Sequence, residues 1–262
     1  MTRGSPVRLA AGETNVMLTL AYDGTEFAGW QVQQGQRTVQ GTLEAGLARM
    51  LGRPVRVRAA GRTDSGVHAV GQVANFSAAM SFPAERWAVA INSYLPPDVR
   101  VLAARPVAGD FDARRSALAR AYHYQLLCGP VGLPHLRRYC YHVRRHLDLR
   151  YLNRAAAYLV GEHDFTVFAA AGDSSRSRVR RVLSAAFFPR APYVVFRIVA
   201  TSFLWKMARS IVGTLLELAE IGTPAADVGR LLARRTRAEV GQTAPSRGLF
   251  LERVWYPPRF EA

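Results

Sequence analysis

The sequence predicts an α+β fold of two tandem ferredoxin-like (RRM-like) halves, each with the element order β-α-β-β-α-β. Stretches rich in β-branched and aromatic residues alternate with stretches of helical periodicity, and the same order occurs twice along the 262 residues. We expect antiparallel sheets joined around a central cleft. The stretch Ala108–Ser116 is the natural joint, so residues 1–108 are expected to form the N-terminal half and residues 109–262 the C-terminal half.

Turn-forming residues mark the ends of the elements in the first half. Thr38 or Thr42 is expected to cap the first helix, and Pro96-Pro97 ends the second. The expected elements are strands at Val16–Tyr22, Val55–Ala59, Gly71–Phe76 and Val99–Val107, with one helix ending at Leu51 and another over residues 83–95.

The second half repeats this order with one extra short helix, although the two halves are not visibly similar in sequence. Leu149, Leu152 and Leu159 share one face of its first helix. The expected elements are a strand at Ala121–Leu127, a helix over 148–165, a hairpin of Val179–Phe188 and Tyr193–Thr201, a helix over 205–222, a short helix at Ala225–Arg235 and a strand over 249–256.

The charge balance favours a nucleic-acid partner. Thirty-five basic residues against nineteen acidic ones leave a net charge of +16, and Lys206 is the only lysine. Codon usage in a GC-rich genome also explains the excess of arginine, but guanidinium groups suit phosphate and stack on bases in either case. Acidic membranes and proteins are the alternative partners.

The remaining composition indicates a cytoplasmic protein without a membrane span. Cys128 and Cys140 lie outside any CxxC pair, as expected of a reduced cytosolic chain. The first residues lack the apolar core of a signal peptide. The most apolar stretch contains Glu217 and Glu220 and is typical of an amphipathic helix.

The stretch Arg62-Thr63-Asp64-Ser65-Gly66 has two interpretations. Asp-Ser-Gly is a common turn signal, and on the motif alone the turn is favoured. In an extended segment, however, Arg62 and Asp64 point to the same side, so the guanidinium can keep the carboxylate ionised as a nucleophile or base. No HxH, HExxH or DxD cluster predicts a metal, and His68 is expected to be structural.

Seven segments in order resemble the tRNA pseudouridine synthase A family (the TruA type). The segment GRTDSGVHA, residues 61–69, resembles the family's central motif, which usually has alanine where Ser65 stands. The others are YDGTEFAGWQ from Tyr22, FDAR from Phe111, ARAYHY from Ala119, GEHDFTVF from Gly161, MARSIVG from Met207 and APSRGLFLERVWYP from Ala244. Together they span nearly the whole chain.

This resemblance implies isomerisation of uridine to pseudouridine, without a cofactor, at positions 38, 39 and 40 of the tRNA anticodon stem-loop. It also implies a homodimer around one tRNA. Asp64 matches the catalytic aspartate, and attack on C6, attack on C1′ and deprotonation of C2′ remain open as its role. Arg62 matches an arginine expected to help expel the target base, which costs a few kcal/mol. An ordinary ion pair with Asp64 is the alternative for Arg62.

Three further positions match substrate-binding residues of the family. Tyr122 matches the tyrosine that stacks on the uracil, Arg209 an arginine that pairs with the aspartate, and Leu249 an apolar residue under the flipped base. The structural alternative for Tyr122 and Leu249 is packing in the sheet or core. For Arg209 it is a solvated basic helix face. On the expected helix, Trp205 and Arg209 are i,i+4 neighbours. The residues expected either to follow tRNA phosphates or to form a solvated surface are Arg176, Arg178, Arg180 and Arg181.

Two alternative functions have sequence requirements that this chain does not meet. A non-catalytic RNA-binding protein with two RRM-like halves requires aromatic RNP-type strands, and none is evident. A phosphohydrolase with an aspartate nucleophile requires a metal-binding DxD after a strand, which the sequence also lacks.

Overall fold

The computed structural model describes residues 12–80, 82–234 and 240–260, and it divides into two compact units. The first contains the residues up to Leu118 and those from Leu251 onward, and the second is Ala119–Phe250. The boundary thus differs from the expected one after residue 108. The Leu118 N–H donates to the Trp255 carbonyl (2.8 Å), so the returning C-terminal strand keeps residues 109–118 with the first unit.

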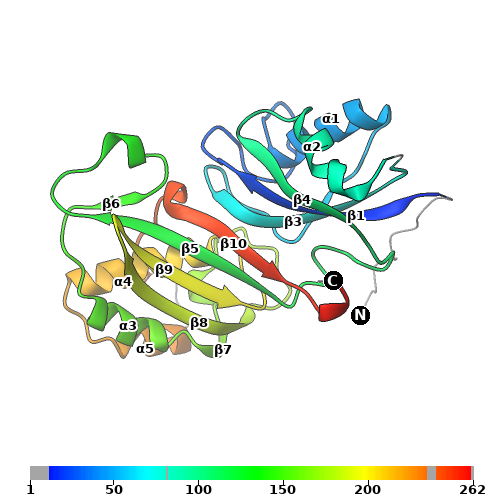
Figure 1. The fold of residues 1–262 in the computed structure, drawn as a ribbon. Coiled ribbons are helices and arrows are strands. Elements are labelled where there is room, and N and C mark those ends of the chain that lie inside the picture. The colour runs from blue at the N-terminus through cyan, green and yellow to red at the C-terminus, as the bar shows by residue number, and fades with distance from the viewer. Residues whose placement is uncertain (1–11, 81, 235–239, 261–262) are drawn as a thin grey trace. The chain divides into compact units, whose positions relative to one another are not determined.

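The first unit contains the predicted order of elements. Its strands follow the order β4-β1-β3-β10, with β2 paired to β3, and β1 is antiparallel to both β3 and β4. The helices α1 and α2 lie on one face of this sheet (Figure 1). The elements are β1 Thr14–Tyr22, α1 Val39–Leu51, β2 Arg58–Ala59, β3 His68–Ala78, α2 Trp87–Asn92, β4 Val99–Val107 and β10 Leu249–Trp255, of which Leu249 and Phe250 belong to the second unit.

Local signals explain why α1 begins and ends where it does. The Thr38 hydroxyl accepts a hydrogen bond from the Gly41 N–H (3.3 Å), which confirms Thr38 as the N-cap. Gly52 ends the helix at φ 68°, in the left-handed region that glycine adopts most readily. Between these caps, Leu43 and Leu47 are fully buried in the core of the unit.

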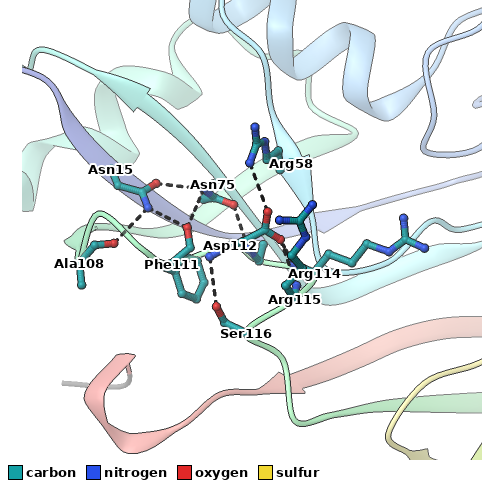
Figure 2. A network of polar contacts seen from close by, with 10 residues as sticks. Asn15, Arg58, Asn75, Ala108, Phe111, Asp112, Arg114, Arg115 and Ser116 are labelled. Atoms are coloured by element: carbon teal, nitrogen blue, oxygen red, sulfur yellow. Dashed lines mark hydrogen bonds and ion pairs between the residues drawn. The ribbon is translucent and has the colours of Figure 1, made fainter. Parts of the chain in front are cut away.

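A buried polar network attaches the segment 108–116 to the sheet of the first unit (Figure 2). The Asn15 side-chain amide donates to the carbonyls of Ala108 (3.1 Å) and Phe111 (2.9 Å). Asn75 donates to the Asn15 side-chain oxygen (3.0 Å) and accepts from the Ala113 N–H (3.0 Å). The two asparagines sit in paired strands, so the segment expected to be a joint is held down by side chains of the sheet itself.

The second unit contains the hairpin and helices that the sequence predicts, with two additional short strands. Its strand order is β10-β5-β9-β8-β7, with β6 parallel to β5 and the β5–β9, β9–β8 and β8–β7 pairs antiparallel. Helices α3, α4 and α5 lie on one face of these strands (Figure 1). The elements are β5 Ala119–Cys128, β6 Tyr141–Val143, α3 Leu149–Ala157, β7 Gly161–Asp164, β8 Val179–Arg190, β9 Tyr193–Ala200, α4 Met207–Glu220 and α5 Asp227–Arg234.

Several predicted element boundaries were wrong. Helix α3 ends at Ala157 instead of continuing to residue 165, because Gly161 turns the chain at φ 116° and β7 then pairs with β8. Helix α4 begins at Met207, because Lys206 has the left-handed φ of 61°. Trp205 therefore precedes the helix, and the helical i,i+4 relationship expected between Trp205 and Arg209 does not apply. Arg235, the last residue of the expected short helix, lies outside the described residues.

The α+β class and the predominance of antiparallel strands are confirmed. The ferredoxin-like description of the two halves and the cleft between them stay predictions. Among the described residues, none of the helices combines the length and the apolar character needed to span a bilayer.

Candidate active site

Asp64 opens a tight turn that leads into β3. The Val67 N–H donates to the Asp64 carbonyl (3.1 Å), and Gly66 has a φ of 73° within this turn. The expected turn is therefore confirmed, and the backbone carbonyl of Asp64 accepts its closing hydrogen bond. The side chain of Asp64 is half-buried, and that of Arg62 is exposed.

Hydrogen bonds to the segment 22–30 anchor the turn on both sides of Asp64. On one side, the Trp30 N–H donates to the Thr63 carbonyl (3.0 Å), and the hydroxyls of Tyr22 and Thr63 are bonded at 2.8 Å. On the other, the Ser65 hydroxyl and the Gly66 N–H both donate to the Phe27 carbonyl, at 3.2 Å and 3.3 Å. The position of the Asp64 backbone is thus set by its two neighbours.

The same region depends on glycines where backbones approach closely. A Cβ at Gly29, which has a φ of 95°, would lie 2.7 Å from the Thr63 carbonyl oxygen. A Cβ at Gly24 would lie 2.0 Å from the Val67 carbonyl oxygen. His68 is 1% exposed, and its Nδ1 accepts the Gly24 N–H (3.0 Å), which gives this histidine the structural role that was expected.

In the second unit, β5 contributes two tyrosines on one face. Tyr122 is 8% exposed, and its ring meets Phe203 edge-on with 4.8 Å between the ring centroids. Tyr124 is fully buried, and its hydroxyl donates to the Pro245 carbonyl (2.6 Å). Burial raises the pKa of Tyr124 well above its ordinary value, so the hydroxyl keeps the proton that it donates.

Arg209 and Leu249 are connected through the segment 244–249. The Arg209 Nε donates to the Ala244 carbonyl (2.8 Å), and the Ala244 N–H donates to the Arg209 carbonyl (3.1 Å). Three residues of 3-10 helix, Ser246–Gly248, then lead into Leu249, which is 6% exposed. A Cβ at Gly248 would lie 2.5 Å from Cε1 of Tyr124, so glycine lets this segment pack directly on the tyrosine.

The arginines of the run 176–181 differ in their surroundings. Arg176 and Arg181 are exposed. Arg178 is half-buried and donates to the Asp173 carbonyl (2.8 Å), and Arg180 donates to the carbonyls of Ser177 (2.9 Å) and Val179 (2.7 Å). Burial lowers the pKa of Arg180; the charge of Asp173 opposes this shift, and the charge of Arg178 adds to it. The side chains of Arg178 and Arg180 therefore bind nearby backbone carbonyls.

The expected site residues thus fall into two sets. Arg62 and Asp64 belong to the first unit, and Tyr122, Arg209 and Leu249 belong to the second. Sequence reasoning missed the bond of Tyr124 to Pro245, although the spacing in RAYHY places Tyr124 on the face of Tyr122. Among the residues that the structure describes, no three or more His, Cys, Asp or Glu side chains gather as a metal-ligand set.

Comparison with known proteins identifies the class of enzyme. A family model described as tRNA pseudouridine synthase matches residues 19–114 and 155–257. Three curated relatives are called tRNA pseudouridine synthase A. The one from Treponema denticola is 44% identical and covers 96% of each chain. The one from Halalkalibacterium halodurans is 45% identical over 88% of this chain and 89% of its own, and the one from Moorella thermoacetica is 46% identical over 91% and 98%.

A chain of a crystallised Cbf5-Nop10-Gar1 complex aligns with 94% of this chain and 60% of its own length, at 14% identity and a TM-score of 0.33. That structural likeness is too weak to support an argument. The sequence matches place the protein among the enzymes that modify RNA. The chain belongs to the tRNA pseudouridine synthase family, and it is an isomerase that acts on tRNA.

Proposed function

We propose that this enzyme converts uridine to pseudouridine at positions 38, 39 and 40 of the tRNA anticodon stem-loop, with Asp64 as its catalytic carboxylate. One observation carries the proposal: Asp64 occupies the aspartate position of the GRTDSG motif, in a turn whose flanking residues Thr63 and Ser65 are both hydrogen-bonded to the segment 22–30. A nucleophile or base must be held in place before it reacts, because orientation contributes strongly to the rate.

The reaction requires a carboxylate but no redox chemistry. The bond between C1′ and N1 of the uridine breaks, a bond between C1′ and C5 forms, and the proton lost from C5 is balanced by the one that N1 gains. Asp64 can attack C6 of the uracil, attack C1′ of the ribose, or deprotonate C2′ to give a glycal. Each of these roles needs the ionised carboxylate.

Arg62 is proposed to assist the exit of the base from the stem. Its side chain is exposed and lies two residues from Asp64. Removing a base from a stacked helix costs a few kcal/mol, and a guanidinium can offset part of this by stacking and by contacting phosphate.

The second unit is proposed to bind the flipped uridine. Tyr122 is assigned to stacking on the uracil and to removal of the C5 proton, Arg209 to pairing with the catalytic carboxylate, and Leu249 to packing under the base. A stacked base contributes about 1–3 kcal/mol. The exposed Arg176 and Arg181 are assigned to tRNA phosphates, with Arg178 and Arg180 beside them.

The test is release of tritium from tRNA labelled at C5 of uridine. Asp64→Asn removes the charge with little change of shape, so we expect it to abolish release while leaving tRNA affinity close to that of the wild type. The matched control is Asp98→Asn, because Asp98 is another carboxylate of the first unit and pairs with Arg37 at the surface (2.8 Å). Full tritium release by Asp64→Asn would refute the assignment of Asp64.

The modified positions are tested with three tRNA variants. Each carries cytidine in place of uridine at two of the positions 38, 39 and 40, so that only one uridine remains. Pseudouridine mapping should find modification at the remaining position in each case. Modification elsewhere in the tRNA would contradict the assignment of the anticodon stem-loop even if Asp64 proves essential.

We further infer, from the family resemblance, that the enzyme is a homodimer and is cytoplasmic. Sedimentation analysis with and without tRNA tests the first inference and should give the mass of two chains. A single-chain mass at concentrations that support full activity would contradict it. Cell fractionation tests the second.

A further inference from the structure

The loop 170–173 clamps the backbone of Trp205 at both of its polar groups. The Ala170 N–H donates to the Trp205 carbonyl (2.9 Å), and the Trp205 N–H donates to a carboxylate oxygen of Asp173 (2.5 Å). Lys206 follows in the left-handed conformation, and α4 begins one residue later. The main chain of Trp205 is therefore held from two sides before the helix starts.

Trp205 is 46% exposed despite this clamp. Part of the ring lies against Gly172, where a Cβ would come within 3.0 Å of Cζ3, so glycine permits this approach. The ammonium group of Lys206 lies 5.0 Å from the ring centroid. An aromatic ring that is partly exposed, on a backbone held at both of its polar groups, suits a flat ligand that stacks on it.

Two arginines follow the same loop in the chain. Arg178 donates to the Asp173 carbonyl (2.8 Å), and its guanidinium is 3.7 Å from the Asp173 carboxylate. Arg176, two residues before Arg178, is exposed. A nucleotide stacked on the indole would thus have Arg178 and Lys206 nearby for its phosphate. The clamp, the exposed ring and these cations together indicate a ligand that has both a base and a phosphate.

We propose that Trp205 is a stacking platform for an unpaired nucleobase of the tRNA, positioned by Asp173. The base must be unpaired, because bases inside a duplex already stack on their neighbours. This inference rests on tRNA as the substrate, and it is independent of the role of Asp64.

The test compares Trp205→Leu and Trp205→Phe in binding a whole tRNA at several salt concentrations. Trp205→Leu should weaken binding by about fivefold to 150-fold, the range expected for the loss of one stacked base. Its salt dependence should match the wild type, because no charge is lost. Trp205→Phe should keep most of the affinity. Tyr158→Leu is the matched control, since Tyr158 is a 45% exposed aromatic residue of the same unit.

A second measurement separates stacking from a purely structural role. The RNA should quench the tryptophan fluorescence of the wild type, and Trp205→Phe should remove most of this quenching although it still binds. Unchanged affinity of Trp205→Leu would overturn the proposal. A changed salt slope, or a change only in the mass of the oligomer, would also overturn it. Failure of the Asp64 assignment would instead appear as turnover by Asp64→Asn, with no effect on these binding curves.

Discussion

Arg209 and Ala244 exchange two hydrogen bonds, one from the arginine side chain and one to its backbone carbonyl. The Nε–O distance is 2.8 Å and the N–O distance is 3.1 Å. These bonds fasten the start of the segment that ends at Leu249 to the first turn of α4. The orientation of Arg209 and the position of Leu249 therefore depend on each other.

Arg209→Lys should separate the charge of this residue from its geometry. Lysine keeps the positive charge but lacks the Nε donor, so the buried carbonyl of Ala244 loses its partner. We expect the free energy of unfolding to fall by about 1–3 kcal/mol and pseudouridine formation to slow. Chemical denaturation and single-turnover assays measure the two effects. Wild-type behaviour in both would show that this bond has no consequence.

Tyr124→Phe should weaken the attachment of the segment 244–249 to strand β5. The variant loses the hydroxyl that donates to the Pro245 carbonyl and keeps the packing of the ring. A loss of about 1 kcal/mol in stability is expected. Because burial raises the pKa of Tyr124, no alkaline change in activity should depend on this residue. Tyr94→Phe, at a more exposed tyrosine, is the control, and pH–rate profiles of the two variants should coincide in shape.

Gly29→Ala should displace the turn that carries Asp64. Both Gly29 and Gly35 have positive φ, but only at Gly29 would a Cβ meet another backbone, 2.7 Å from the Thr63 carbonyl oxygen. Gly35→Ala is expected to cost about 1 kcal/mol of stability and to stay active. Gly29→Ala should cost more and lose activity. Equal effects of the two substitutions, measured by thermal unfolding and tritium release, would argue against the close contact.

The clamp formed by Asp173 should weaken in acid. Burial raises the pKa of Asp173, but hydrogen bonds from the Trp205 and Ser175 N–H groups and the charge of Arg178 outweigh it, so the net pKa lies below the ordinary value. A carboxylate with a lowered pKa stabilises the fold above its ordinary pKa and loses that contribution as the pH falls through the folded value.

Asp173→Asn tests this pH dependence. The stability difference between the wild type and the variant should be largest near pH 6 and should shrink towards about pH 3, below the ordinary pKa. Urea unfolding at several pH values measures it. A difference that stays constant over this range would mean that ionisation of Asp173 does not stabilise the clamp.

The contributions of Asn15 and Asn75 to stability should depend on each other (Figure 2). Asn75→Ala removes the donor to the Asn15 side-chain oxygen and the acceptor of the Ala113 N–H, at a cost of about 1–3 kcal/mol. Because the two amides share one network, the double variant Asn15→Ala, Asn75→Ala should lose less stability than the sum of the single losses. Additive losses in urea unfolding would contradict this coupling.

Much of the fold could be predicted because its signals are local. Thr38 and Gly52 delimit α1 by chemistry within one turn of the chain, and the Asp64–Val67 turn follows from Asp-Ser-Gly. The end of α3 could not be predicted, because apolar residues at helical spacing continue to Leu159. The pairing of β7 with β8, a non-local interaction, ends the helicity.

The candidate site shows the same division. The order of elements, the basic charge, the turn at Asp64 and the family motifs were determined by the sequence by itself, since each depends on residue types and short spacings. The bond of Asp173 to Trp205 spans 32 positions, that of Tyr124 to Pro245 spans 121, and that of Asn15 to Phe111 spans 96. Only the tertiary structure decided these contacts, because hydrogen-bond partners so far apart along the chain are chosen by strand pairing and packing.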